Sequence, residues 1–139
     1  MATDVSPLAA AVAKVGDRWT LLIVEALLDG PSRFTQLAQT IPGISTNVLS
    51  QRLKHLEQTG VVAAELYSQR PARHSYALTA AGRELAGALR LLSSWGAEHG
   101  EDAEAPAHTL CGTPLRARWF CPTCDVAVDD PQADALRYA

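Results

Sequence analysis

The chain has 139 residues, of which 47% are hydrophobic and 19% charged, which is typical of one globular domain with a short appendage and excludes a fibrous or wholly disordered protein. The longest apolar run, Leu21 to Val24, is far shorter than the ~20 residues of a membrane-spanning helix, and Met1 to Ala10 lacks the features of a signal peptide, so we expect a cytoplasmic protein with no membrane partner. The net charge is −3, and three cysteines in a reducing compartment favour metal or redox chemistry over a disulfide framework.

Capping residues and apolar spacing predict four helices in the first 60 residues. Ser6 can cap the first helix, with Pro7 at the position where a missing N–H is harmless. Asp17 can cap the second, which Gly30-Pro31 ends, and Gly60 suits the left-handed residue that closes the fourth. The expected ranges are about 7–15, 17–29, 34–39 and 46–59.

The third and fourth helices are joined by the sequence Ile41-Pro42-Gly43-Ile44, in which proline and glycine interrupt the helix and favour a tight turn. Ser45 can cap the fourth helix. Helical spacing gives that helix an apolar stripe, formed by Val48, Leu49, Leu53 and Leu56. The opposite face is polar without being acidic and carries Asn47, Gln51, Lys54 and Gln58, with Ser50 at its flank.

A hairpin with a basic tip is predicted next. Val61 to Tyr67 has strand character, 68–73 is a polar Arg/Pro segment, and His74 to Leu78 is the returning strand. Thr79 can cap a last long helix from Ala80 to about Trp95 or His99. Its apolar stripe exceeds the needs of a small monomer core and favours a partner helix.

Charge is distributed unevenly along the chain. Residues 31–90 carry seven Arg or Lys against three acids, whereas residues 1–30 contribute −2 and residues 91–139 contribute −5. A basic middle between acidic ends fits a surface for a polyanion on one side of the protein.

These elements together predict a winged helix-turn-helix that binds double-stranded DNA. The major groove admits one helix, and polar side chains on its outer face can read base edges there. The N-terminus of the fourth helix would lie near phosphates. The basic tip of the hairpin at 68–73, which forms the wing, would lie along the DNA backbone. The candidate DNA-binding residues are Ser45, Thr46, Asn47, Ser50, Gln51, Arg52, Lys54, Arg70 and Arg73.

Several of these residues have simpler alternatives. The polar face of the fourth helix could be only a solvated surface, and the module could serve protein contacts without DNA. Arg52 lies beside the packed stripe, so a structural salt bridge to Glu25 or Glu84 competes with a phosphate contact. Trp19 and Trp95 are expected in the core or at an interface.

Five motifs resemble those of the HxlR-type, MarR-like bacterial transcription regulators, in order and with that family's spacing over about residues 8–95. They are Gly16-Asp17-Arg18-Trp19-Thr20-Leu21-Leu22-Ile23, Arg33-Phe34, Ile41-Pro42-Gly43-Ile44-Ser45, Leu49-Ser50-Gln51-Arg52-Leu53 and Tyr76-Ala77-Leu78-Thr79-Ala80-Ala81-Gly82. The resemblance implies a homodimer, built through the first and last helices, that represses or activates transcription from a pseudo-palindromic operator. The implied interface residues are Leu8, Val12, Val15, Leu85, Leu89, Leu92 and Trp95.

The sequence departs from that family at one consequential place. Many members carry a cysteine ahead of the first helix that senses oxidants or electrophiles, whereas this chain has Val5-Ser6-Pro7 there. That sensing mechanism is therefore not expected. Any small-molecule effector would act elsewhere, for instance in a dimer-interface cavity near Trp19 and Trp95.

The C-terminal segment contains two pairs of metal donors, His108 with Cys111 and Cys121 with Cys124, separated by nine residues. Four thiolate and imidazole donors suit a closed, tetrahedral, structural Zn²⁺ site. Gly112 and Pro122 resemble the knuckle turns of zinc ribbons, with short strands expected at 116–120 and 125–128. The alternatives are a Cys121–Cys124 disulfide switch, which would make the protein a redox- or metal-responsive regulator, or three inert thiols.

The expected organisation is a mainly α (α+β) winged helix-turn-helix domain over residues 1–99, an acidic linker at 100–107 and a Cys/His zinc-binding tail at 108–139. Dimerisation helices are expected at both ends of the domain. We expect no enzyme, because no nucleophile, base and orienting group occur together in the sequence and the metal cluster has no open position.

Overall fold

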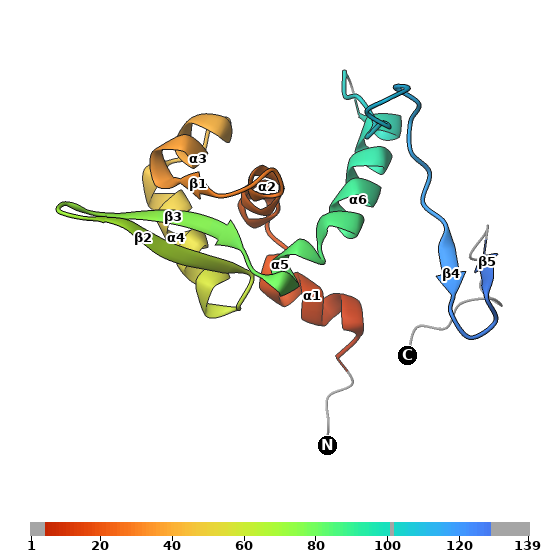
Figure 1. The fold of residues 1–139 in the computed structure, drawn as a ribbon, viewed down its shortest axis with the longest axis horizontal. Helices are drawn as coiled ribbons and strands as arrows, with labels where there is room; N and C mark the ends of the chain where they lie inside the picture. Colours follow the sequence, from red (N-terminus) through yellow and green to blue (C-terminus); the bar gives the residue numbers. More distant parts are fainter. Residues whose placement is uncertain (1–4, 101, 129–139) are drawn as a thin grey trace. The chain divides into compact units, whose positions relative to one another are not determined.

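A computed structural model describes residues 5–100 and 102–128 (Figure 1). The chain divides into two compact units, which are described separately. One comprises Leu8–Leu89 and contains a three-stranded sheet with most of the helices. The other comprises the described residues on either side, including the two-stranded sheet of the C-terminal segment.

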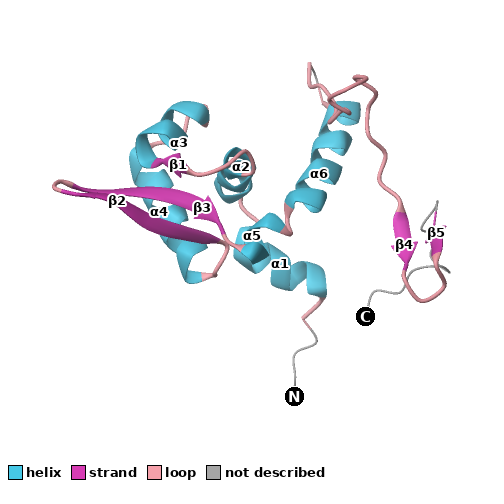
Figure 2. Ribbon diagram, in the orientation of Figure 1, coloured by secondary structure: helices cyan, strands magenta, loops and turns pink. Residues whose placement is uncertain are grey.

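The helices that precede the hairpin are drawn in cyan in Figure 2, and the second and fourth begin directly after their predicted capping residues. Asp17 caps the second helix by accepting hydrogen bonds from the backbone N–H groups of Trp19 and Thr20. Ser45 accepts one from Val48 at the start of the fourth, and Gly60, with φ of 76°, follows its end. The four helices are α1 (Pro7–Val15), α2 (Arg18–Leu27), α3 (Phe34–Thr40) and α4 (Thr46–Gln58).

The sheet has the order β1–β3–β2 and is antiparallel throughout. Strands β2 (Val62–Gln69) and β3 (Ala72–Leu78) extend further than predicted, so the turn between them is only Arg70-Pro71, and Arg73 lies in a strand. A third strand, β1 (Ser32–Arg33), pairs with Ser75 and Tyr76 and was not predicted, because two residues carry no periodic signal. The hairpin projects from the rest of its unit (Figure 1).

The core of this unit is built by α2, α3, α4 and the base of the hairpin. The predicted stripe of α4 is confirmed for its main members, since Leu49, Leu53 and Leu56 are completely or almost completely buried. They pack with Ile23 of α2 and Leu37 of α3 in one apolar cluster. Burial of one face of α4 fixes which side of the helix stays exposed.

The predicted last helix is interrupted. Thr79 caps α5 (Ala80–Arg83) as expected, but α6 (Ala86–His99) begins only after Glu84 and Leu85. Around this break the backbone N–H of Leu85 bonds to the carbonyl of Gly82, a tighter pattern than the α-helical one. Gly82 is packed so closely that a Cβ there would lie 2.2 Å from the Val61 carbonyl oxygen. The close packing of α5 on the hairpin base favours an early end to that helix.

The C-terminal segment forms two small hairpin turns. Ala107 and Pro114 form an isolated antiparallel bridge around the first turn. Strands β4 (Trp119–Cys121) and β5 (Val126–Val128) flank the second and are shorter than the predicted strands. Residues 129–139 of the predicted tail lie outside the described part of the chain.

Candidate nucleic-acid interface

Helix α4 presents the predicted polar face to solvent. Its apolar side is fixed in the core, and Ser45 satisfies the N–H of Val48 at the first turn. Among the predicted DNA-contact residues on and before this helix, Arg52 is half-buried and the others are exposed. The exposed ones are Ser45, Thr46, Asn47, Ser50, Gln51 and Lys54. A helix held rigidly on one side and polar on the other has the form needed to enter a major groove.

Arg52 forms a salt bridge, but with Asp17 and not with the predicted partners Glu25 or Glu84. Its Nε lies 3.2 Å from Oδ1 and 3.2 Å from Oδ2 of Asp17. The two residues are 35 positions apart, so the pair ties α4 to the start of α2. Nearby, His55 Nε2 lies 2.8 Å from the Lys14 carbonyl oxygen at the end of α1. The orientation of α4 is thus fixed by polar contacts as well as by its buried face.

Asp17 is the centre of this polar arrangement. Besides its two backbone partners, its Oδ2 accepts the hydroxyl hydrogen of the fully buried Thr20 at 2.6 Å. Burial alone would raise the pKa of Asp17, but the hydrogen bonds from Thr20, the positive charge of Arg52 and the N–H of Trp19 together lower it below its ordinary value. The carboxylate is therefore charged at neutral pH and stabilises the N-terminus of α2.

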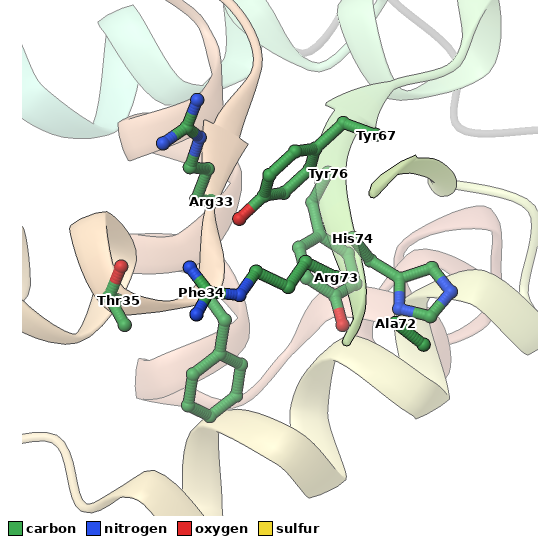
Figure 3. A pocket seen from close by; sticks show the side chains of 8 residues that line it. All are labelled: Arg33, Phe34, Thr35, Tyr67, Ala72, Arg73, His74 and Tyr76. Carbon is green, nitrogen blue, oxygen red and sulfur yellow. The ribbon is translucent and has the colours of Figure 1, made fainter. Parts of the chain in front are cut away.

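A basic pocket of about 450 Å³ lies between β1, the start of α3 and the hairpin. Figure 3 shows that Arg33 and Arg73 both line it, together with the ring of Tyr67. The Arg33 guanidinium lies 4.5 Å from the centre of that ring, a cation–π arrangement, and the Arg33 backbone N–H donates to Gln36 Oε1 at 2.8 Å. None of the eight lining residues is acidic, so the pocket has the charge and size to receive an anionic group.

Arg33 is a candidate contact that the sequence interpretation omitted. Two features of the sequence could have indicated it: Arg33 is one of the seven basic residues of 31–90, and it belongs to the motif Arg33-Phe34. Its association with the wing depends on the pairing of β1 with β3, which a two-residue strand does not reveal in sequence. Tyr76 also lines this pocket, and burial and the charge of Glu57 raise its pKa, which keeps its hydroxyl protonated.

The apolar residues assigned to a dimer interface divide into two groups. Val15 and Leu89 are each only 8% exposed and belong to the core cluster of the single chain, so little of either side chain is left for a partner. Leu85 is half-buried against that core. The others are exposed, with Leu8 and Val12 on α1, and Leu92 and Trp95 on α6. Trp95 stacks on His99, and neither Trp95 nor Trp19 lines the basic pocket.

The metal-donor residues of the C-terminal segment lie in two separate pairs. His108 Nδ1 is 3.3 Å from Cys111 Sγ, and the three cysteines are free thiols. Hydrogen bonds with the side chain and backbone of Thr113 lower the pKa of Cys111. Hydrogen bonds with the backbone and side chain of Cys124 and with the backbone of Thr123 lower the pKa of Cys121. Within residues 5–100 and 102–128, no three His, Cys, Asp or Glu residues form one potential metal cluster. Zinc binding through four ligands therefore stays a prediction.

The model of the HxlR-like helix-turn-helix family matches residues 14–104. The chain belongs to this family. A relative from Mycobacterium bovis, described as an uncharacterized HTH-type transcriptional regulator, is 41% identical over 114 residues, which cover 79% of this chain and 72% of the relative. The described residues contain no helix long and apolar enough to cross a membrane.

Solved structures of other regulators share the fold described above. The reduced form of the transcriptional regulator YodB from Bacillus subtilis has a TM-score of 0.58 at 34% identity, covering 70% of this chain and 97% of YodB. The redox regulator HypR in its reduced form has a TM-score of 0.62 at 31% identity, covering 66% of this chain and 90% of HypR. This HxlR-like protein is a DNA-binding transcriptional regulator with a winged helix-turn-helix fold, and its family is not one of enzymes.

Proposed function

We propose that the protein is a homodimeric repressor that binds a pseudo-palindromic operator, with one α4 helix in the major groove of each half-site. The observation that carries this proposal is the exposed polar face of α4, on a helix whose other face is locked in the core. Asn47, Ser50 and Gln51 are placed to reach base edges, because the N-terminal part of a recognition helix makes these contacts. Such a protein acts in the cytoplasm, where bacterial DNA lies.

Phosphate contacts would flank the base contacts on two sides. The free N–H groups at the start of α4 and the hydroxyl of Thr46 favour an anion near that helix terminus. On the hairpin side, Arg33 and Arg73 line one pocket without any acidic neighbour among its lining residues. A DNA phosphate seated there would fix the register of α4 in the groove. Arg70, at the turn of the hairpin, would reach the backbone beyond it.

Dimerisation is supported by apolar residues that the monomer leaves exposed. Leu92 and Trp95 on α6 are 54% and 63% exposed, and Leu8 on α1 is 70% exposed. Large apolar side chains that repeat at helical spacing and stay exposed are typical of an interface. A twofold dimer would place two α4 helices on one duplex, which accounts for a palindromic site.

The experiment is selection of duplexes from a randomised library by the wild-type protein, by Gln51→Ala and by Gln58→Ala. We expect an inverted-repeat motif for the wild type and relaxed preference at one symmetric pair of positions for Gln51→Ala, a loss of about 1–3 kcal/mol if Gln51 makes a bidentate base contact. Gln58→Ala is the matched control, because Gln58 is the last residue of α4 and is exposed. Identical motifs for Gln51→Ala and the wild type would refute the role of Gln51. Absence of any enriched motif would favour a protein-interaction module instead.

A further inference from the structure

The C-terminal segment contains a first hairpin turn that holds two metal donors close together. Ala107 bridges Pro114, and inside this bridge the His108 N–H donates to the Thr113 carbonyl at 2.9 Å. The Gly112 N–H donates to the His108 carbonyl at 2.7 Å, and Gly112 has φ of 69°, which favours glycine. This backbone brings His108 Nδ1 within 3.3 Å of Cys111 Sγ. Both side chains are exposed and so are accessible to an ion.

The second turn repeats this arrangement. Strand pairing of Cys121 with Val126 closes it, and Asp125, with φ of 56°, takes the left-handed position that Gly112 takes in the first turn. Each turn thus has a donor, a second donor three residues later and a left-handed residue directly after it.

We propose that these two turns close on one Zn²⁺, held by His108, Cys111, Cys121 and Cys124. Three thiolates and one imidazole are donors that zinc prefers, and four protein ligands fill its tetrahedron, so the site is structural and leaves no position for water or substrate. The segment between the turns allows the closure, because residues 115–118 form neither helix nor strand. The nine residues between Cys111 and Cys121 need only one reversal of direction to bring the two turns together.

The apolar side chains of this segment are a second reason for closure. Leu110 is 88% exposed and Phe120 is 60% exposed, and Leu115, Trp119 and Val126 are also exposed. Five large apolar residues exposed within so short a stretch show that the segment buries no core of its own in this conformation. A segment of this size cannot bury a core by itself, whereas a metal held by its ends supplies folding free energy directly.

The experiment measures metal binding by the full-length chain, independently of DNA. The protein is reduced, stripped with EDTA and then titrated with Zn²⁺, and with Co²⁺ as a spectroscopic probe. We expect one metal ion per chain by native mass spectrometry, a Co²⁺ spectrum of a tetrahedral site with thiolate charge-transfer bands, and simultaneous protection of all three cysteines from alkylation.

Variants then test whether both turns contribute. His108→Ala and Cys121→Ser are each expected to lower zinc affinity by more than about tenfold, the loss that even outer-shell partners of a metal can cause. His108→Cys retains zinc and shifts the Co²⁺ spectrum toward four thiolates. His99→Ala is the matched control, since His99 stacks on Trp95 and lies outside both turns.

Three results would overturn the proposal. The first is a reduced chain that takes up less than half an equivalent of zinc. The second is an unchanged affinity in His108→Ala and Cys111→Ser, because the ion would then be held by Cys121 and Cys124 alone. The third is a chain that forms a Cys121–Cys124 disulfide and after reduction still binds no zinc, which would favour a redox switch.

Discussion

Asp17 caps α2 and forms an ion pair with Arg52 of α4. Comparing the replacement of Asp17 with that of Arg52 separates the contribution of capping from that of ion pairing. In Asp17→Ala, α2 loses the N-cap that accepts hydrogen bonds from the N–H groups of Trp19 and Thr20, which lowers the free energy of unfolding by about 1 kcal/mol. The buried Thr20 hydroxyl loses the acceptor that lies 2.6 Å away, and leaving this donor unsatisfied costs about 1–3 kcal/mol. The Arg52 pair has side chains 36% and 44% exposed and contributes only about 0.2–1 kcal/mol. We therefore expect Asp17→Ala to lower the free energy of unfolding by about 2–4 kcal/mol, and Arg52→Ala by less than about 1 kcal/mol.

The assay is urea unfolding followed by circular dichroism, at one protein concentration because a dimer's stability depends on it. Asp17→Ser is the matched variant, since serine keeps a capping oxygen but carries no charge for Arg52, and it should recover most of the capping contribution. Equal losses in Asp17→Ala and Arg52→Ala would refute this reasoning. So would a loss below about 0.5 kcal/mol in Asp17→Ala, the range of an ordinary surface substitution.

Four further results are expected. Because the pKa of Asp17 is lowered on folding, its contribution to stability is present above the unfolded value of about 3.9 and is lost as pH falls through the folded value, so acid unfolding curves should be shallower for Asp17→Asn. Gly82→Ala should destabilise by about 1–3 kcal/mol in the same urea assay, because its Cβ would meet the Val61 carbonyl, and an unchanged midpoint would show that the backbone yields freely. Arg73→Ala should weaken binding to all duplexes and reduce the salt slope by about 1, whereas Arg90→Ala, also an exposed arginine, should leave the slope unchanged in anisotropy titrations. Leu92→Glu should shift the protein toward monomer in sedimentation velocity, and a fully dimeric variant would exclude Leu92 from the interface.

Local signals in the sequence predicted much of the DNA-binding unit. Caps at Asp17, Ser45 and Thr79 act on backbone groups two or three residues away, so their effect is readable from a short window. Long-range features were missed for the opposite reason. The partner of Arg52 lies 35 residues away, and Glu25, Glu84 and Asp17 are equivalent in sequence until the helices pack. The pairing of β1 with β3 likewise arises only in the assembled sheet.

The distinction between core and interface was also beyond the sequence. Val15 and Leu89 share helical stripes with residues that stay exposed, and periodicity alone does not show which part of a stripe the monomer buries. In the C-terminal segment, spacing predicted the two donor pairs, and each pair is confirmed as a turn. Whether both turns bind one ion depends on their approach to each other, which residue spacing does not determine.

Native mass spectrometry of the purified chain, alone and with a duplex from its own upstream region, tests the central claim most directly. We predict a dimer that takes up one duplex as an intact complex of two chains and loses it when Asn47 and Gln51 are both replaced by alanine. A monomer, or a dimer that binds the duplex equally well after that double replacement, would contradict recognition by α4.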